Sequence, residues 1–489
     1  GWNIYGVRLD GKKPEIGIPE KLLNQQLDYS QPLPDPDLKN GKTVIYGRIL
    51  GYDPTHGIAL KFNCTDWLFF DVFGQSVPVV EDGSFRYETN MMLPGEATLR
   101  VGRKRFELFL MPGGKLEVTI NLPEIFWSES HLFGKKENGQ LIWFEGTYAA
   151  LNTELVKHAG LMNIYSADNF YENICGVTPA QYKKYVTKIY EKNRGEILKN
   201  KSLSDAARTY MINKLEMSYF FAIRGYKGNI SYAPMISGKK GVKRADMTVD
   251  ESYYDDILEL DFIHSPYIRY GSYPDFVRAA TEDFKGKFEP QPVWEDILRA
   301  KPLGSTLARL KPLSEKQMLT LDSISEPEIK KALTVKNKEV MDLLAESANK
   351  TGYTVCQLDT AVTADGLLAV VTRPYRGKVV LIDMWNTWCG PCMRAMNSLK
   401  SVKEELKDVV YVYIADESSP EGKWKITIPD IHGIHYRITN EQSSALGKLY
   451  EYPGIPTYFV IDREGKLSYK VTGFPGAEVM KEELLKAGK

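Results

Sequence analysis

The sequence predicts a multidomain α+β protein with an N-terminal antiparallel β-sandwich, a helical middle and a C-terminal α/β domain. The length of 489 residues corresponds to about three domains at roughly 150 residues each. Short strand-like runs separated by turns fill residues 42–124, and helix-start signals dominate residues 125–349. From residue 350 to residue 489 strands alternate with helices, which is typical of an α/β domain.

The composition narrows the class of protein further. Hydrophobic residues make up 43% of the chain, enough to form sizeable cores, and the 63 basic residues balance 63 acidic ones. A net charge of zero argues against nucleic acid as a partner, because binding to it usually requires a basic domain or stripe. No apolar run approaches the roughly 20 residues of a membrane helix. We therefore expect a soluble or peripherally anchored chain with no transmembrane segment.

Residues 1–41 are expected to form an extended N-terminal segment rather than part of a core. Prolines recur through this stretch, at Pro14, Pro19, Pro32, Pro34 and Pro36. Because proline lacks a backbone N–H and restricts the residue before it, such a density favours irregular extended structure.

Turn signals support the β-sandwich prediction for residues 42–124. Gly83 lies in a short turn between two strand-like runs, and Pro112-Gly113-Gly114 lies between two others. Hairpins joined by such turns, repeated at short intervals, are typical of a small antiparallel sandwich.

Residues 125–349 are predicted to be a helical domain. Thr178 precedes Pro179 and is followed by Gln181 three residues later, which is the pattern of a capping box. The same pattern begins at Ser325. Between these helices, residues 225–246 are expected to form a long loop.

Four basic residues lie in that expected loop: Lys239, Lys240, Lys243 and Arg244. Such a cluster could bind an anion. A solvated loop is the better interpretation, because a short run of charges needs no partner in water.

The five cysteines are unevenly distributed, since only Cys389 and Cys392 lie close together. They follow a near-continuous apolar run at residues 379–384, which predicts a buried strand, and precede a predicted helix over residues 393–406. A helix N-terminus carries unpaired N–H groups and partial positive charge, which favours the thiolate of the first cysteine. We expect Cys389 to be the exposed attacking thiol and Cys392 to resolve the mixed disulfide.

Other interpretations of the cysteine pair stay open at this point. A structural zinc site needs further ligands, and His432 and His435 lie roughly 40 residues away in the sequence. A purely structural disulfide is a second alternative. Haem attachment through C-x-x-C-H is excluded because Met393 follows the pair. The remaining cysteines are expected to be buried bystanders, and a redox role is left open for each: Cys64, Cys175 and Cys356.

Two segments of the C-terminal domain resemble the thioredoxin superfamily. Residues 382–392, with the sequence IDMWNTWCGPC, resemble the active-site stretch, and residues 454–457, with the sequence GIPT, resemble the cis-proline loop. The flanking residues 376–381 and 459–466 are closer to the TlpA/ResA-like envelope branch. The resemblance covers about residues 350–489 and implies a thioredoxin fold for the C-terminal domain.

The resemblance assigns roles to individual residues. It implies that Cys389 and Cys392 are catalytic and that Asp383 is the buried acid that assists deprotonation of Cys392. From the residues alone, Asp383 could instead be a capped aspartate at a strand end. The resemblance also implies a substrate-docking surface around the pair, formed by Trp388, Gly390, Pro391, Ile455 and Pro456.

One position departs from the family pattern. Many relatives carry a kink-forming proline five residues after the second cysteine, where this sequence has Asn397. We therefore expect a straighter active-site helix.

The implied function is a thiol-disulfide oxidoreductase of the protein-disulfide reductase type, acting on envelope proteins through a mixed disulfide. The Cys-Gly-Pro-Cys motif is that of thioredoxin, whose potential is near about −270 mV, against about −120 mV for the oxidant DsbA. This favours a reductant or exchanger over a primary oxidant. No cofactor and no metal are expected.

The resemblance also implies partners and a location. The expected location is the periplasm or cell envelope, with the signal peptide and any lipid-bearing N-terminal cysteine outside this chain. The partners would be disulfide-containing envelope proteins, including apocytochromes during cytochrome c maturation, and a membrane electron donor. Residues 42–124 also resemble the β-rich modules that precede thioredoxin domains in envelope lipoproteins.

Two alternative functions remain from the sequence. In the first, the protein is a binding or scaffold protein whose thioredoxin-like domain docks partners without turnover. In the second, it is a peroxidase that acts through Cys389.

Overall fold

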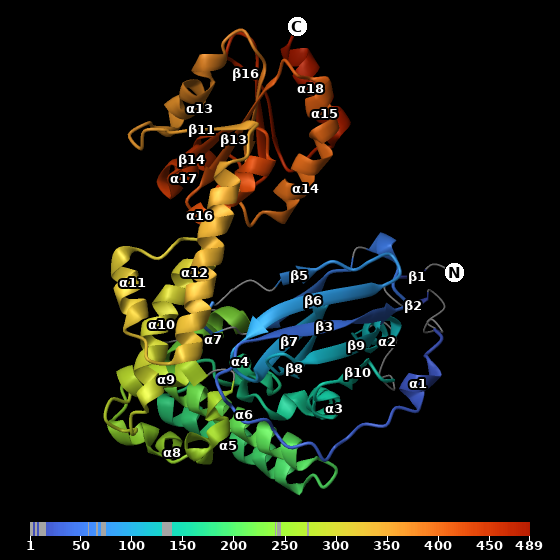
Figure 1. Cartoon of the computed structure of the whole chain (residues 1–489), viewed down its shortest axis with the longest axis vertical. Helices are drawn as coiled ribbons and strands as arrows, with labels where there is room; N and C mark the ends of the chain where they lie inside the picture. The colour runs from blue at the N-terminus through green and yellow to red at the C-terminus, as the bar shows by residue number, and fades with distance from the viewer. Residues whose placement is uncertain are drawn as a thin grey trace. The chain divides into compact units, whose positions relative to one another are not determined.

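The computed structural model describes residues 3–4, 7–8, 16–56, 58–64, 67–69, 75–129, 139–239, 241, 246–270 and 273–489. The chain divides into two compact units (Figure 1). The first contains Gly1–Lys301 and Ile324–Ala332, and the second contains Pro302–Ser323 and Leu333–Lys489. The division into segments 1–41, 42–124, 125–349 and 350–489 stays a prediction.

Strands of the first unit form two larger sheets. The first sheet has the order β10-β9-β3-β6, with bounds Ile142–Gly146, Lys115–Asn121, Gly41–Leu50 and Ser84–Met91. The second has the order β5-β4-β7-β8, with bounds Gln75–Val77, Leu60–Cys64, Gly95–Val101 and Lys104–Leu110. A short pair, β1 (Asn3–Ile4) and β2 (Val7–Arg8), precedes them.

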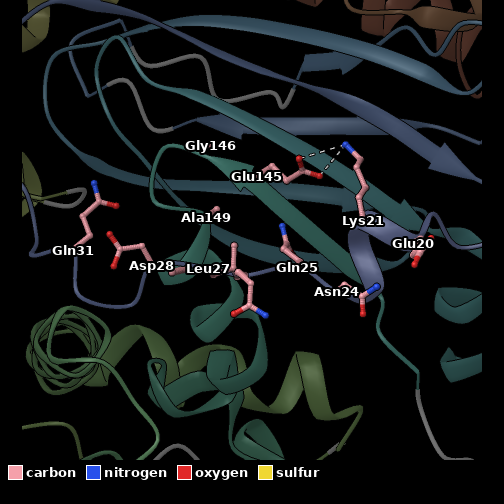
Figure 2. Close-up of a pocket in the computed structure, with 12 residues that line it drawn as sticks. Glu20, Lys21, Asn24, Gln25, Leu27, Asp28, Gln31, Glu145, Gly146 and Ala149 are labelled. Carbon is pink, nitrogen blue, oxygen red and sulfur yellow. Dashed lines mark hydrogen bonds and ion pairs between the residues drawn. The ribbon is translucent and has the colours of Figure 1, made fainter.

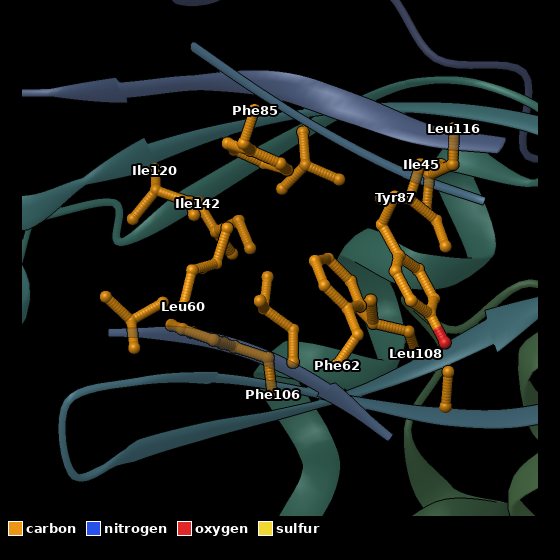
Figure 3. Close-up of a cluster of buried hydrophobic side chains, with 14 of the residues drawn as sticks. Ile45, Leu60, Phe62, Phe85, Tyr87, Phe106, Leu108, Leu116, Ile120 and Ile142 are labelled. Atoms are coloured by element: carbon orange, nitrogen blue, oxygen red, sulfur yellow. The ribbon is translucent and has the colours of Figure 1, made fainter. Parts of the chain in front are cut away.

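The two larger sheets share one hydrophobic core, with side chains from both filling the space between them (Figure 3). Phe62 of β4 stacks on Tyr87 of β6, with ring centroids 5.0 Å apart and planes 6° apart. In β4 and the first half of β6, buried residues alternate with more exposed ones, as a pleated strand with one covered face requires. This alternation explains the strand-like runs in the sequence.

The expectation of a purely antiparallel arrangement is wrong at one place. β3 pairs with β9 in parallel, with Ile45 opposite Leu116. The second sheet is formed by chain between these two strands, and this long crossover lets them run in the same direction. A further strand, β10, lies beyond Glu124 in the stretch predicted to be helical, and it pairs antiparallel with β9.

A buried side chain closes the free edge of β8. Asn152 lies on α3 (Ala149–His158) and is fully buried. Its Oδ1 accepts from the backbone N–H of Phe109 at 2.7 Å, and its Nδ2 donates to the backbone carbonyl of Phe109 at 2.9 Å. The amide thus replaces a neighbouring strand at this position, which protects the edge from pairing with another chain.

The N-terminal segment runs along the other sheet's edge at β10. It contains a short helix, α1 (Glu20–Leu23), so it is not extended throughout. Gln25 donates from its side chain to the carbonyl of Phe144 at 2.5 Å. The N-terminal segment, β10 and α3 border a cavity of about 770 Å³ (Figure 2). In this cavity Lys21 forms an ion pair with Glu145 at 3.1 Å.

Helices make up most of the chain between α3 and the mixed sheet of the second unit. The capping box predicted at Thr178 is confirmed, because Thr178 and Gln181 exchange hydrogen bonds at the start of α5. The helices here are α5 (Pro179–Lys199), α6 (Asp205–Arg224), α7 (Tyr226–Ser237), α8 (Asp255–Leu258), α9 (Tyr273–Glu282), α10 (Pro292–Ala308), α11 (Glu315–Asp322) and α12 (Pro327–Ala348). Shorter helices are α2 (Leu122–Glu129) and α4 (Phe170–Asn173).

The long loop expected over residues 225–246 is wrong in its first half, where α7 forms. Asn229 of α7 donates to the hydroxyls of Tyr165 at 3.1 Å and Tyr182 at 2.8 Å. These contacts outweigh the weak local helix signal, including Pro234 inside the helix. Of the basic cluster, Lys240, Lys243 and Arg244 lie outside the described residues.

The second unit contains a mixed sheet with the order β11-β14-β13-β12-β15-β16. These strands span Tyr353–Cys356, Gly433–Ile438, Val410–Asp416, Val380–Met384, Thr457–Ile461 and Leu467–Thr472. β12 pairs in parallel with β13 and antiparallel with β15. Every residue of β12 is buried, as its apolar run predicts.

Helices cover this sheet and hold its loops. They are α13 (Ala364–Thr372), α14 (Gly390–Ser398), α15 (Lys400–Glu405), α16 (Glu421–Thr427), α17 (Asn440–Leu449) and α18 (Ala477–Ala487). The single helix predicted over residues 393–406 is interrupted at Leu399, between α14 and α15. Ser398 donates its hydroxyl to the carbonyl of Arg394 at 3.2 Å, a side-chain bond that bends helices. The expected straightness is therefore wrong, although Asn397 replaces the proline.

A close backbone contact joins α16 to residues 302–323, the first segment of the second unit. Leu310 has a positive φ of 56°. If residue 422 had a Cβ atom, that atom would lie only 2.0 Å from the carbonyl oxygen of Leu310. Glycine at position 422 is therefore required for residues 302–323 to pack against α16.

We predict that Asn152→Ala destabilises the first unit by roughly 2–4 kcal/mol, because both backbone groups of Phe109 lose their partner while buried. Urea unfolding measures the change. The matched control is Asn90→Ala, which removes an exposed asparagine of β6 and should change stability by less than about 0.5 kcal/mol. Equal effects of the two substitutions would contradict the edge-closing role.

Candidate functional site

The cysteine pair lies where β12 leads into α14. Cys389 and Cys392 form a disulfide with Cα atoms 5.3 Å apart. Cys389 is the N-cap of α14, and its sulfur accepts a hydrogen bond from the backbone N–H of Cys392 at 3.1 Å. In this oxidised state Cys389 is 4% exposed and Cys392 is fully buried. Cys389 is thus the more accessible sulfur, but less exposed than expected.

Trp388 lies on the surface beside the disulfide. Its side chain is 56% exposed, while Trp385, three residues earlier, is buried. The indole N–H of Trp388 donates to the hydroxyl of Ser418 at 2.9 Å. Ser418 is in turn bonded to the carboxylate of Asp416 through both its backbone N–H and its hydroxyl. This chain of bonds fixes an exposed aromatic ring in one orientation.

A second, buried network holds the loop between β12 and α14. The side-chain oxygen of Asn386 accepts from the backbone N–H of Asp416 at 3.1 Å and from the hydroxyl of Ser419 at 2.8 Å. The Ser419 hydroxyl also accepts from the backbone N–H of Thr387 at 3.0 Å. The loop after β13 therefore positions the loop that carries the cysteines.

The predicted cis-proline loop lies opposite the pair. The Ile455–Pro456 peptide bond is cis, and the carbonyl oxygen of Ile455 is 3.8 Å from the sulfur of Cys389. Ile455 is half-buried and Pro456 is buried. Gly390 and Pro391 are exposed at the start of α14. The structure thus gathers the predicted docking residues around the disulfide.

Asp383 lies on the inner face of β12 that carries the cysteine pair. Val380, Ile382 and Met384 belong to one core cluster, whereas Leu381 belongs to the cluster that contains both cysteines. Because alternate residues of a strand face the same side, Asp383 lies on the face of Leu381. The structure therefore places this acid in the same core as the sulfurs.

The environment of Asp383 strongly favours its neutral form. The residue is 2% exposed. Neither carboxyl oxygen has a hydrogen-bond partner within the described part of the chain. Burial raises the pKa of Asp383 well above its usual range, and the positive charge of Lys403 acts in the opposite direction. A carboxyl with this pKa can carry a proton at neutral pH.

Lys403 is a residue of this core that the predicted site did not include. Its ammonium donates to the hydroxyl of Tyr413 at 2.9 Å and to the carbonyl of His432. It also lies 4.9 Å from the ring centroid of Tyr411 and 5.0 Å from that of Tyr413. Burial lowers the pKa of Lys403 to about 8.

The sequence does contain one signal for the position of Lys403. Leu399, Val402 and Leu406 recur at helical spacing, and Lys403 lies four residues after Leu399 on the same helix face. A lysine on an apolar face indicates a side chain that packs inward. The pattern does not reveal which groups it meets.

His435 is fully buried and stacks on Tyr413, with ring centroids 5.1 Å apart and planes 16° apart. Its Nε2 is 2.6 Å from the carbonyl of Ile431. Burial lowers the pKa of His435 to about 4, so the ring is neutral at pH 7. His432 is exposed, and the two histidines do not share a site with the cysteine pair. No cluster of three or more metal-binding side chains occurs within the described residues.

Cys64, Cys175 and Cys356 are half-buried and take no part in the disulfide. The residues that line the cavity of Figure 2 belong to the first unit, whereas the cysteine pair belongs to the second. A second cavity of about 1170 Å³ lies along α5 in the same unit.

Comparison with known proteins places the domain that carries the site. Residues 377–467 match the thioredoxin-like family. The thiol-disulfide oxidoreductase ResA of Bacillus thuringiensis subsp. konkukian is 24% identical over 114 residues, covering 23% of this chain and 66% of that protein. The thiol:disulfide interchange protein DsbE of Pseudomonas aeruginosa is 24% identical over 109 residues, covering 22% of this chain and 59% of that protein.

Among solved structures, a thiol:disulfide interchange protein of the thioredoxin family from Chlorobium tepidum is also similar. It is 24% identical, has a TM-score of 0.22, and covers 24% of this chain and 83% of that chain.

The C-terminal domain is therefore thioredoxin-like. Within that class it is similar to the ResA and DsbE thiol-disulfide exchange proteins. The chain spans less than two thirds of the length of these two relatives. None of the helices in the described residues combines the length and the apolar character that crossing a membrane requires.

We predict that His435 makes the second unit less stable in acid. The pKa of His435 is about 4 in the folded protein and near 6.5 in the unfolded chain. The unfolded chain therefore binds the proton more readily. As a result, the free energy of unfolding is highest above about pH 6.5 and decreases as the pH falls towards 4. The loss is up to about 3 kcal/mol. Urea unfolding at pH 7 and pH 4.5 measures it.

His435→Gln should remove this part of the pH dependence, and His432→Gln, which changes an exposed histidine, should leave it intact. The same acid sensitivity in the His435→Gln variant and the unsubstituted protein would contradict the prediction.

Proposed function

We propose that this protein is a thiol-disulfide oxidoreductase that reduces or exchanges disulfides of envelope proteins. The observation that carries the proposal is the Cys389–Cys392 disulfide at the N-terminus of α14, facing the Ile455–Pro456 loop. The names of the relatives, ResA and DsbE thiol-disulfide proteins, support the same reaction class.

In the proposed cycle the two cysteines exchange electrons with a substrate disulfide. The thiolate of reduced Cys389 attacks one substrate sulfur, a mixed disulfide forms, and the other substrate sulfur leaves with the electron pair. Cys392 then attacks the Cys389 sulfur, which re-forms the Cys389–Cys392 disulfide and releases the second substrate thiol. The two sulfurs carry both electrons, so the reaction needs no bound cofactor and no metal.

The surrounding residues are assigned roles that fit their positions. The backbone N–H of Cys392 and the helix N-terminus stabilise negative charge on Cys389. Trp388, Gly390 and Pro391 offer an exposed surface beside it, and the loop at Ile455 offers backbone groups to an extended substrate segment. In its ionised form, the carboxylate of Asp383 is the base that takes the proton of Cys392 before its attack.

The wider setting is also proposed. A periplasmic or cell-envelope location would supply oxidised protein substrates, including apocytochromes. Each reduction of a substrate leaves the pair oxidised, so an electron donor is required to restore the thiols, and a membrane donor is proposed for this role. The β-sheet and helical parts of the chain would select or hold partners.

We predict turnover of insulin disulfides with dithiothreitol as the electron source, and loss of that turnover by at least about 100-fold in Cys389→Ser, because the attacking sulfur is absent. The precipitation of insulin B chain measures the rate. Cys356→Ser, which changes a half-buried cysteine outside the disulfide, is the matched control and should keep the activity.

An inert unsubstituted protein with an unreactive Cys389 would favour the scaffold function over the enzyme. Consumption of hydrogen peroxide that depends on Cys389, without insulin turnover, would favour the peroxidase function.

We predict that Cys392→Ser traps substrates covalently, because the mixed disulfide forms but is not resolved. Non-reducing gel electrophoresis of envelope extracts should show adducts that dithiothreitol releases, and mass spectrometry identifies them. The double variant Cys389→Ser/Cys392→Ser is the control. Adducts of equal yield in the control would contradict trapping through Cys389.

A further inference from the structure

β10 lies at one edge of its sheet, whose strand order is β10-β9-β3-β6. It runs antiparallel to β9, and just beyond β10 the backbone N–H of Thr147 donates to the carbonyl of Lys115 at 2.8 Å. In an antiparallel pair, residues bonded to the neighbouring strand alternate with residues whose N–H and carbonyl point the other way. The backbone groups of Phe144 and Gly146 therefore point to the outer edge of β10.

The outer edge of β10 is covered less completely than the edge of β8. At β8, Asn152 supplies both an acceptor and a donor to the backbone of Phe109. At β10, the side chain of Gln25 donates to the carbonyl of Phe144, and among the bonds of the described residues it supplies no acceptor there. A strand edge with open backbone groups is a template for another extended chain.

The N-terminal segment is anchored on both sides of Gln25. Before it, Lys21 forms the ion pair with Glu145. After it, the hydroxyl of Tyr148 donates to the carbonyl of Pro32 at 3.1 Å. Because the bond between these anchors comes from the side chain of Gln25, the backbone of the segment stands farther from β10 than a paired strand would. The cavity of Figure 2 is bounded by this part of the segment and by the end of β10.

The lining of this cavity is polar and carries an excess of negative charge. It contains three exposed amide side chains, those of Asn24, Gln26 and Gln31. Its charged residues are Glu20, Asp28, Glu145 and Lys21, of which Lys21 and Glu145 are paired with each other. Hydrogen bonds from Ser30 lower the pKa of Asp28, so its carboxylate is ionised at pH 7. Glu20 and Asp28 thus leave the cavity complementary to a cationic ligand.

We propose that this cavity is a docking site for an extended, basic peptide segment of a partner protein, which adds a strand to the outer edge of β10. A peptide N–H replaces the amide of Gln25 at the carbonyl of Phe144, and a peptide carbonyl accepts from the N–H of Phe144. Basic side chains of the peptide face Glu20 and Asp28. The site goes beyond the proposed function, because it lies in the first unit and needs no cysteine.

The exchange of hydrogen bonds at Phe144 favours the bound state. The single bond from Gln25 is lost, and two bonds to the peptide backbone replace it. The amide of Gln25 belongs to the lining of the cavity, so once released it is available to the other edge of the peptide. Main-chain bonds of this kind provide affinity for any extended segment, whereas the two carboxylates provide selection for basic residues.

The test uses the full-length protein and a fluorescently labelled eight-residue peptide in which lysine and threonine alternate. Fluorescence anisotropy at low salt measures its affinity. The same peptide with every backbone nitrogen methylated keeps its charge but loses its N–H donors, and it should bind at least about tenfold more weakly. A peptide of alternating glutamate and threonine keeps the donors but reverses the charge, and it should also bind at least about tenfold more weakly.

Substitutions and amide exchange locate the peptide on the protein. The double variant Glu20→Gln/Asp28→Asn removes the two unpaired carboxylates and should weaken binding of the lysine peptide by about fivefold. Asp35→Asn/Asp37→Asn is the matched control, because it changes two exposed carboxylates of the same segment outside the lining, and it should leave the affinity unchanged. Hydrogen exchange measured by mass spectrometry should slow at the N–H of Phe144 when the peptide binds.

Each of several results would overturn the proposal. These are absent binding of the lysine peptide at millimolar concentration, equal binding of the methylated or the glutamate peptide, and unchanged exchange at Phe144 in the complex. Slower exchange at Phe144 with an oligosaccharide but not with the peptide would assign the cavity to a different ligand. Cys389→Ser/Cys392→Ser should bind the lysine peptide as the unsubstituted protein does, so absent insulin turnover overturns the proposed function alone.

Discussion

The C-terminal unit is organised around an ionisable carboxyl placed in the interior of its central strand. β12 is buried on both faces, and Asp383 is the residue of this strand whose side chain is energetically costly to bury. Its face is otherwise lined by aromatic residues of β13 and β15 and by the cysteine pair. Because water is excluded from this face, the electrostatic interactions of each remaining charge are stronger than they would be in solvent. The lowered pKa values of Lys403 and His435 are both consequences of burial in that low-dielectric interior.

The cysteine loop is supported from one side by a single neighbouring loop. Asn386 and Ser419 join the backbone of the two loops through buried hydrogen bonds, and Ser418 holds the exposed ring of Trp388. A reactive pair requires this kind of rigid support, because the sulfur must meet its target in a defined geometry. On the other side of the disulfide, the carbonyl oxygen of the half-buried Ile455 faces the sulfur of Cys389. Two different loops therefore flank the pair.

How much of the structure could be predicted depended on how far apart the interacting residues lie in the sequence. The strand, cysteine pair and helix cap at residues 379–392 form one continuous stretch, so local chemistry was enough to predict them. The parallel pairing of β3 with β9 joins distant strands, and short turn signals carry no information about it. The same limit applies to Lys403 in the site. The sequence indicates which helix face carries this residue, but its contacts with Tyr413 and His432 depend on how α15 packs on the sheet.

The closure of β8 by Asn152 has a consequence for the growing chain. The asparagine lies 43 residues after the strand position that it covers. At synthesis rates of roughly 5–20 residues per second, the edge would remain open for about 2 to 9 seconds before its cover exists. During that interval β8 presents unpaired backbone groups to any neighbouring nascent chain. The order of β8 and α3 in the sequence therefore creates an interval during synthesis in which the edge of β8 can pair with another chain. In the folded protein Asn152 covers this edge.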